Sequence, residues 1–134
     1  MNRRIRILLV DDNAVNLMVA RLMLQKFFQH AEVTEAHGGV QALALLETQS
    51  FDLVLMDMVM PDVDGLEATK TLRSRFPAPA RDVPVLGLTA STNPVDRDRC
   101  LAAGMNEVLH KPMDTAELMR TVGRCVRLAR EGKL

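Results

Sequence analysis

The chain alternates five times between a short apolar run and a longer segment with helical periodicity, and this alternation constrains the fold most strongly. The short runs cover residues 5–10, 32–36, 52–57, 83–89 and 107–111, and those at 5–10, 52–57 and 83–89 are largely apolar. Parallel strands need helix-length crossovers, and strands that are buried on both faces are apolar throughout. We therefore expect an α/β fold of the (βα)5 type, a doubly wound five-stranded parallel sheet with helices on both faces.

The segments between these runs carry helix signals. Helices are expected from Ala14 to about Gln29, over residues 40–49, from Leu66 to about Arg75, from Pro94 to Ala103 and after Asp114. Pro94 in a first turn, Gly104 as a C-cap and Asp114 with Glu117 three residues later are typical start and stop signals.

Two of these helices show an apolar face at helical spacing, which predicts the side that packs on the sheet. In the first helix that face comprises Val15, Met18, Val19, Leu22 and Met23. In the last helix it comprises Leu118, Val122, Cys125, Val126 and Ala129.

Composition argues against several classes of protein. The chain has 134 residues, which fits one domain, and residues 1–134 show no linker-like segment. Lys plus Arg and Asp plus Glu both number 17, so the formal net charge is zero. A zero charge argues against direct nucleic-acid binding. No apolar stretch approaches the ~20 residues of a membrane span or forms a signal-peptide core, so we expect no membrane segment and a cytoplasmic location.

Polar side chains follow four of the five expected strands at the point where each ends. They are Asp11 and Asp12 after the first strand, Asp57 after the third, Thr89 after the fourth and Lys111 after the fifth. Ligands of open α/β sheets bind beyond the carboxyl ends of the strands, so we expect these side chains to converge. Each has an ordinary explanation when taken alone, because aspartates often cap helices and lysines are usually solvated.

The charges of this group indicate a divalent cation. Three carboxylates and one ammonium sum to −2, which would repel a phosphate, whereas a divalent cation brings the sum to about zero. Oxygen ligands of this kind suit Mg²⁺. One carboxylate can then act as a nucleophile and form an aspartyl phosphate, while the ammonium and hydroxyl stabilise the transferring phosphoryl group.

Four segments together resemble the receiver domain of two-component response regulators. They are "LLVDDNAVN", "DLVLMDMVMPDVDGLEA", "VLGLTA" and "CLAAGMNEVLHKPMDTAEL". The resemblance extends from about Ile5 to Arg127, the expected domain core, and is greatest to the receivers of hybrid sensor histidine kinases. It implies a flavodoxin-like fold with strand order 2-1-3-4-5 and a role in phosphorelay signalling.

The resemblance also implies a phosphoacceptor and a Mg²⁺ site. Asp57 would accept the phosphoryl group from a phosphohistidine of a histidine kinase or a histidine phosphotransfer domain. Asp12 would coordinate Mg²⁺ directly and Asp11 through water. Asp57 and the backbone carbonyl of Val59 would complete the set of protein ligands.

The remaining roles implied by the resemblance concern phosphoryl binding and the response to it. Lys111 and Thr89 would bind the phosphoryl group, and the Lys111–Pro112 bond would be cis. Similar domains often carry Tyr or Phe as a switch three residues before the lysine, but Val108 occupies that position here. A switch would then act through an aliphatic side chain or a backbone shift. Similar domains dimerise or dock through a face formed by the fourth helix, the fifth strand and the fifth helix, so the resemblance implies a homodimer face there.

Two other function classes are weighed. A degenerate receiver that only binds a partner should have lost an acid or the lysine, and this chain keeps Asp57 and Lys111. An aspartate-nucleophile phosphatase needs an Asp-x-Asp arrangement on the first strand, whereas Asp11 and Asp12 are adjacent. The sequence therefore favours a signalling receiver, which assists its own phosphorylation and dephosphorylation, over an enzyme with a separate substrate. It leaves open the histidine donor, the output and whether the chain belongs to a longer kinase.

Overall fold

The computed structural model describes residues 5–111 and 114–133, in which strands and α-helices alternate along the chain. The elements are β1 (Ile5–Val10), α1 (Ala14–Phe27), β2 (Ala31–Ala36), α2 (Gly39–Thr48), β3 (Leu53–Asp57), α3 (Gly65–Arg75), the 3-10 turn η1 (Ala80–Asp82), β4 (Val85–Thr89), α4 (Pro94–Ala103), β5 (Glu107–His110) and α5 (Thr115–Arg130). None of the helices in this part of the chain combines the length and apolar character needed to cross a bilayer.

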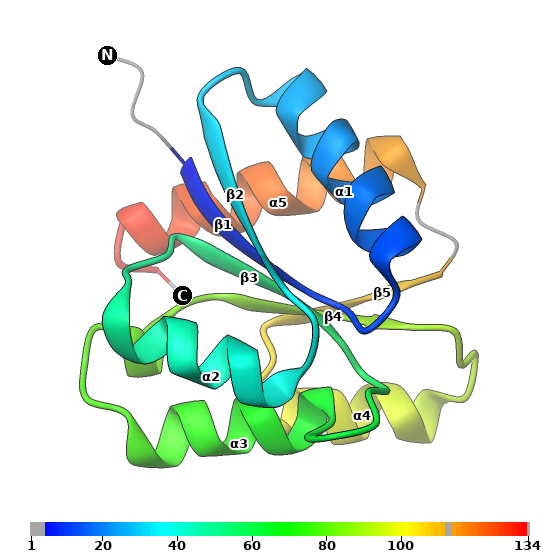
Figure 1. The fold of residues 1–134 in the computed structure, drawn as a ribbon, viewed down its shortest axis with the longest axis vertical. Helices are drawn as coiled ribbons and strands as arrows, with labels where there is room; N and C mark the ends of the chain where they lie inside the picture. Colours follow the sequence, from blue (N-terminus) through cyan, green and yellow to red (C-terminus); the bar gives the residue numbers. More distant parts are fainter. Residues whose placement is uncertain (1–4, 112–113, 134) are drawn as a thin grey trace.

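The five strands form one parallel sheet in the order β2-β1-β3-β4-β5. Helices α1 and α5 cover one face of the sheet, and α2, α3 and α4 cover the other (Figure 1). The expected doubly wound, flavodoxin-like α/β fold is confirmed. In this order β1, β3, β4 and β5 are consecutive. Because all strands are parallel, the carboxyl ends of these four strands lie side by side along one edge of the sheet.

The core consists of two apolar clusters, one on each face of the sheet. Alternate residues of β1 enter different clusters, with Ile7 and Leu9 packing under α1 and α5 and with Leu8 and Val10 packing under α2, α3 and α4. All four side chains are at most 2% exposed. Burial on both faces explains why the strand is apolar without polar alternation.

The prediction for the buried face of α1 is wrong. Leu17, Ala20 and Leu24 pack on the sheet, whereas Val15, Met18, Val19 and Leu22 are exposed and Met23 is half-buried. Both stripes recur at helical spacing, so periodicity reveals two apolar faces without deciding which one meets the sheet. In α5 the expected face is buried at Leu118, Val122, Cys125 and Val126, and Ala129 is half-buried.

Element boundaries differ from the expected ones by one or two residues. Strand β4 begins at Val85 instead of Val83, and the residue before it, Pro84, has no backbone N–H to donate to a ladder. Helix α1 ends at Phe27 instead of Gln29. The described cis peptide bond is Ala78–Pro79, and the bond expected to be cis, Lys111–Pro112, lies outside the described residues.

Candidate functional site

The carboxyl ends of β1 and β3 bring three acidic side chains together. One carboxylate oxygen from each of Asp11, Asp12 and Asp57 lies within 4.8 Å of the others. Asp11 and Asp57 are each 5% exposed, whereas Asp12 is exposed. The convergence predicted from the strand ends is therefore present, with two carboxylates buried and one facing solvent.

Lys111 joins this group from the end of β5. Its Nζ lies 3.0 Å from Oδ1 of Asp57 and 3.3 Å from Oδ2 of Asp11. Its backbone N–H donates to the carbonyl of Thr89 at 2.8 Å, which fixes the chain after β5 against the end of β4. A single ammonium therefore bridges the two buried carboxylates.

Local hydrogen bonds orient these side chains. The backbone N–H of Asn13 donates to Oδ1 of Asp11 at 2.9 Å, and the Asn13 side chain caps α1 by accepting from Val15 and Asn16. The backbone N–H of Val59 donates to Oδ1 of Asp57 at 3.4 Å. The cap role of Asn13 was not predicted from the sequence, although Asn is a favoured N-cap residue directly before a helical run.

Thr89 ends β4 beside the acidic group and is 5% exposed. Its Oγ1 accepts from the backbone N–H of Ser91 at 3.0 Å. Ser91 in turn donates its hydroxyl to Asp96 at 2.6 Å. The threonine is thus in the expected place, and its hydroxyl is engaged with the loop that leads to α4.

Burial and charge shift the pKa values of the central pair. Burial raises the pKa of Asp57, and the negative charge of Asp11 adds to this effect, so the hydrogen bond from Lys111 offsets the rise only in part. Burial alone would lower the pKa of Lys111, but hydrogen bonds and charge from Asp57 and Asp11 outweigh it and raise the pKa. In the protein without a metal ion, the single charge of Lys111 therefore does not fully compensate the negative charge of the buried carboxylates.

The residues fit a hard divalent cation. The three carboxylates offer oxygen atoms within 4.8 Å of one another, and Asp12 offers its carboxylate from the solvent side. Mg²⁺ is usually held by one or two carboxylates and keeps several waters, so a partly open acidic site is suitable. Asp11, Asp12 and Asp57 are the side chains that would hold it.

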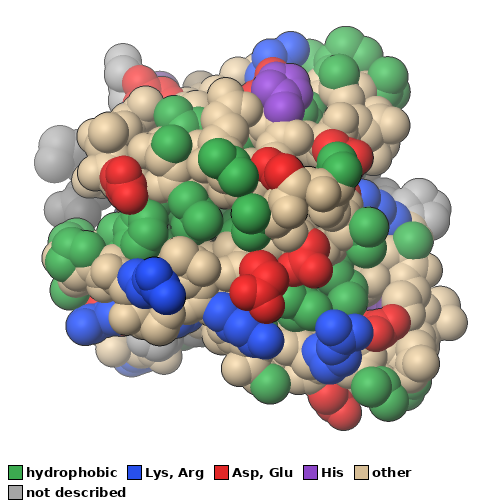
Figure 2. Space-filling view, turned by 60° about the horizontal axis from the view of Figure 1, so that its bottom comes forward, with side chains coloured by type: hydrophobic (Ala, Val, Ile, Leu, Met, Phe, Trp, Pro, Cys, Tyr) green, Lys and Arg blue, Asp and Glu red, His purple; other side chains and the backbone are tan. Residues whose placement is uncertain are grey.

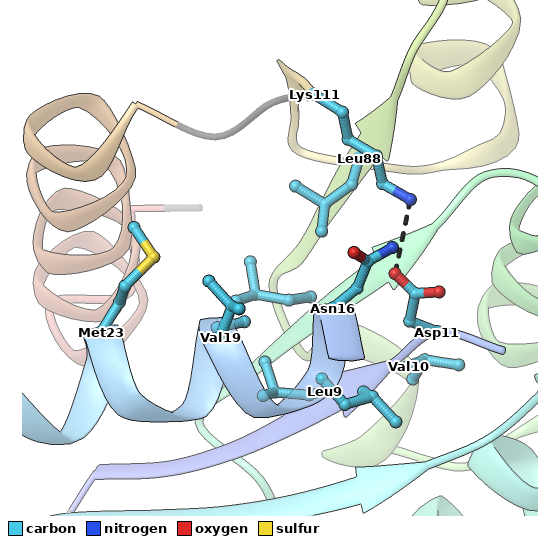
Figure 3. A pocket seen from close by; sticks show the side chains of 11 residues that line it. Leu9, Val10, Asp11, Asn16, Val19, Met23, Leu88 and Lys111 are labelled. Carbon is cyan, nitrogen blue, oxygen red and sulfur yellow. Dashed lines mark hydrogen bonds and ion pairs between the residues drawn. The ribbon is translucent and has the colours of Figure 1, made fainter. Parts of the chain in front are cut away.

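A cavity of about 220 Å³ adjoins the acidic group on the α1 side of the sheet. Figure 3 shows Val19 and Met23 of α1 on one side of it, Leu88 on another, and Asp11 paired with Lys111 at its polar end. Val108, the expected switch position, belongs to the other side of the sheet, where it packs in the cluster under α2, α3 and α4 and is 9% exposed.

The family model of the response regulator receiver domain matches residues 7–123. The chain belongs to the response regulator receiver family. Receiver domains are signalling domains of two-component systems. In this chain Asp11, Asp12 and Asp57 lie together at the carboxyl ends of β1 and β3.

Relatives and solved structures agree with this assignment. The receiver is 34% identical to hybrid signal transduction histidine kinase B of Dictyostelium discoideum, over 85% of this chain and 6% of that protein. It is 34% identical to the sensor protein GacS of Pseudomonas syringae pv. syringae, over 96% of this chain and 14% of that protein. The chain therefore spans less than a fifth of the length of either relative.

One solved structure bears on the metal. It is the receiver domain of sensor histidine kinase PA1611 from Pseudomonas aeruginosa PAO1, with a magnesium ion coordinated in its active-site cleft. It is 40% identical to the present chain, covers 92% of this chain and 98% of its own, and superposes with a TM-score of 0.82. The chemotaxis protein CheY4 of Vibrio cholerae superposes equally well, with a TM-score of 0.82 at 29% identity, covering 92% of this chain and 99% of its own.

Proposed function

We propose that this receiver accepts a phosphoryl group from a phosphohistidine onto Asp57, with Mg²⁺ as cofactor, and changes its surface to signal to a partner. The observation that carries the proposal is the buried Asp57 carboxylate, 3.0 Å from the Lys111 ammonium and grouped with Asp11 and Asp12. The magnesium ion in the cleft of the PA1611 receiver supports the choice of metal.

The chain's own residues provide the nucleophile and much of the charge stabilisation. An Asp57 carboxylate oxygen forms the new O–P bond as the donor's P–N bond breaks, and the electron pair of that bond goes to the imidazole nitrogen. Lys111 then pairs with the phosphoryl oxygens, and the Thr89 hydroxyl turns from Ser91 to donate to them. When bound, Mg²⁺ neutralises the carboxylates and draws the phosphoryl group toward them.

The metal would be held by the carboxylates of Asp12 and Asp57 directly and by Asp11 through water. The backbone carbonyl of Val59 would be a further ligand. The exposure of Asp12, whose carboxylate faces solvent, supports a direct role for that residue. The domain thereby assists its own phosphorylation and dephosphorylation and needs no separate substrate.

The exposed face of α1 supports a helical donor domain as the partner. Val15 is 61% and Leu22 is 57% exposed, with Met18 and Val19 between them on the same face. Large exposed apolar side chains grouped on one face mark interaction sites. This face begins two residues after Asn13, beside the acidic group, so a partner helix lying on α1 would carry its phosphohistidine toward Asp57. A histidine kinase or a histidine phosphotransfer domain provides such a helix.

Four further expectations stay predictions. A homodimer through α4, β5 and α5 would use a groove lined by both basic and acidic side chains, including Arg97, Arg120 and Glu117. The face that bears α3 and α4 shows side chains of both signs interspersed (Figure 2), in keeping with a protein partner instead of nucleic acid. Buried Val108 would respond by an aliphatic or backbone shift, and we expect the domain to act in the cytoplasm.

Intact-mass measurement tests the proposal directly. The chain is incubated with acetyl phosphate or phosphoramidate and Mg²⁺, and we expect the mass of one added phosphoryl group. Asp57→Asn or excess EDTA should abolish the addition, whereas Asp52→Asn at the opposite edge of the sheet should not. Full labelling of the Asp57→Asn variant, or no labelling of wild type by any donor, would falsify the proposal.

A further inference from the structure

The loop between β3 and α3 is closed tightly at its base. The backbone N–H of Gly65 donates to the carbonyl of Met58 at 3.0 Å, so the chain returns to the end of β3 after seven residues. A Cβ atom on Gly65 would lie 2.3 Å from the carbonyl oxygen of Asp57, which only glycine avoids. Val59 lies just past this base and Asp62 lies at the tip. The base is therefore fixed to the phosphoacceptor, while the tip needs another anchor.

Asp62 provides that anchor by bonding to α2. Its Oδ1 accepts from the backbone N–H of Gly39 at 3.2 Å, and its Oδ2 accepts from the backbone N–H of Val40 at 3.2 Å. The first N–H groups of a helix have no partner within the helix, so a carboxylate from another segment satisfies two of them here. Hydrogen bonds from the backbone N–H groups of Val63, Val40 and Gly39 lower the pKa of Asp62, which keeps the carboxylate ionised.

Two glycines at the start of α2, the N-cap Gly38 and the first helical residue Gly39, make this contact close. A Cβ atom on Gly38 would lie 2.6 Å from Oδ2 of Asp62, and one on Gly39 would lie 2.2 Å from the carbonyl oxygen of Val63. A larger residue at Gly39 would push the loop backbone away from α2, and one at Gly38 would displace the Asp62 carboxylate. The Gly-Gly pair is thus where the loop tip meets the helix.

We propose that Asp62 is a positioning residue that tethers the β3–α3 loop to α2 and so keeps the Val59 carbonyl placed for Mg²⁺. The inference rests on the proposed function, because it concerns the same metal site. Val59 lies between the fixed base of the loop and the tethered tip, so the tether limits how far its carbonyl can move. Releasing the tip lowers the fraction of molecules with a binding-competent loop, and the apparent affinity for Mg²⁺ falls by that fraction.

The proposal has a reciprocal consequence for α2. If the tether strengthens Mg²⁺ binding by some factor, bound Mg²⁺ must strengthen the tether by the same factor. Mg²⁺ bound at the acidic group would therefore stabilise the hydrogen bonds between Asp62 and the first turn of α2, on the side of the sheet opposite α1. A role for Asp62 in helix capping alone predicts no such link.

Calorimetric titration of the full chain with MgCl₂ tests the affinity. We expect Asp62→Ala to raise the Kd for Mg²⁺ by about tenfold, as is typical when a residue that supports metal ligands is lost. Asp62→Asn, which keeps one acceptor oxygen, should fall between Asp62→Ala and wild type. Gly39→Ala should weaken binding in the same direction, because its Cβ would displace the Val63 carbonyl.

Asp52→Ala is the matched control. Asp52 also accepts a backbone N–H from a distant segment, that of Arg6 at 2.8 Å, but it lies at the other edge of the sheet. This variant should lower the melting temperature and leave the Kd for Mg²⁺ unchanged. A comparable rise in Kd for Asp52→Ala would show that general destabilisation explains the effect and would overturn the proposal.

Amide hydrogen exchange gives the second readout. Saturating MgCl₂ should slow exchange at Gly39 and Val40 in wild type by about tenfold, and this slowing should be absent in Asp62→Ala. If wild type binds Mg²⁺ and is phosphorylated but Asp62→Ala binds as tightly, only the tether proposal fails. If wild type shows no saturable Mg²⁺ binding, the proposed function and the tether proposal both fail.

Discussion

The Lys111 ammonium lies 3.0 Å from Oδ1 of Asp57, the carboxylate that we propose as the phosphoryl acceptor. It also reaches Asp11 at 3.3 Å, so one positive charge serves two buried carboxylates. The hydrogen bond from Lys111 lowers the pKa of Asp57, but burial and the charge of Asp11 outweigh it, so the group keeps an excess of negative charge. The first two predictions follow from that imbalance.

Replacing Lys111 by alanine should destabilise the metal-free domain by about 1–2 kcal/mol. Removing one partner leaves Asp11 and Asp57 facing each other in a buried site, and the effect is smaller than for a fully buried pair because Lys111 is partly exposed. Urea denaturation followed by circular dichroism measures the change. Millimolar Mg²⁺ should restore part of the loss. The exposed Lys70, paired with Glu67 at 3.8 Å, is the control, and Lys70→Ala should change stability little.

Mg²⁺ should stabilise the folded domain, and the gain should grow with pH. At about ten times the Kd, linkage gives about 1.4 kcal/mol. Because burial raises the folded pKa of Asp57 above its unfolded value, the stability that comes from its protonation is complete below the unfolded pKa. That stability is lost as pH rises through the folded pKa. The free energy of unfolding of the metal-free protein therefore falls as the pH rises from the unfolded to the folded pKa of Asp57. At the low-pH end of this range Mg²⁺ must displace a proton from Asp57 to bind, so the gain from Mg²⁺ is smaller there.

Melting temperatures in EDTA and in 10 mM MgCl₂, an excess of about tenfold for a site with a Kd of about 1 mM, measure this difference. The difference should be larger well above the pKa of Asp57 than near it, and Asp57→Asn should remove the part that depends on pH. Equal melting temperatures with and without Mg²⁺ across the pH range would contradict the metal site.

Arg73 should be a major source of stability far from the acidic group. Its guanidinium donates to the carbonyls of Gly104 at 3.1 Å, Arg81 at 2.7 Å and Val83 at 2.6 Å, and to Oδ1 of Asn106 at 3.0 Å. We expect Arg73→Met to lower the free energy of unfolding by about 2–3 kcal/mol, because several acceptors lose a charged donor. Lysine should recover only part of this loss, since it lacks the planar fork.

Arg75, on the same helix, is the control for this prediction. It is exposed, so Arg75→Ala should stay within about 0.5 kcal/mol of wild type in the same urea titration. An Arg73→Met variant as stable as Arg75→Ala would show that the four hydrogen bonds contribute no net stability.

The two cysteines should be inert in the native protein. Burial, followed by the charge of Glu107, raises the pKa of Cys125 to about 11, and burial raises the pKa of Cys100 as well. Both thiols are fully buried. We expect alkylation by iodoacetamide at pH 8 to be at least about 100-fold slower than in urea, because little thiolate is present and access is blocked. Rapid native alkylation of one thiol would contradict its burial.

Much of the fold could be read from the sequence because the relevant signals are local. Five short strand-like runs separated by helix-length segments indicate a parallel sheet covered on both faces. Caps such as Asn93 before Pro94 act within a few residues of one another. The strand order was expected from family resemblance. The convergence of Asp11, Asp57 and Lys111 could be predicted because parallel strands end at a common edge.

Other features could not be predicted from the sequence, because they depend on which surfaces of the helices and loops pack against each other and against the sheet. Two stripes on α1 have apolar residues at helical spacing, and only docking on the sheet buries Leu17, Ala20 and Leu24 and leaves Val15, Met18 and Leu22 exposed. The roles of Asp62 and Arg73 depend on acceptors and donors 8 to 33 residues away.

The sequence by itself determined the fold class, the acidic residues and the lysine, since periodicity and strand ends are properties of neighbouring residues. Tertiary structure alone decided that Lys111 bridges Asp57 and Asp11, that α1 presents an apolar face, and that Asp62 holds the β3–α3 loop on α2. These are contacts between segments far apart in the chain, and their geometry is set by how the helices pack on the sheet.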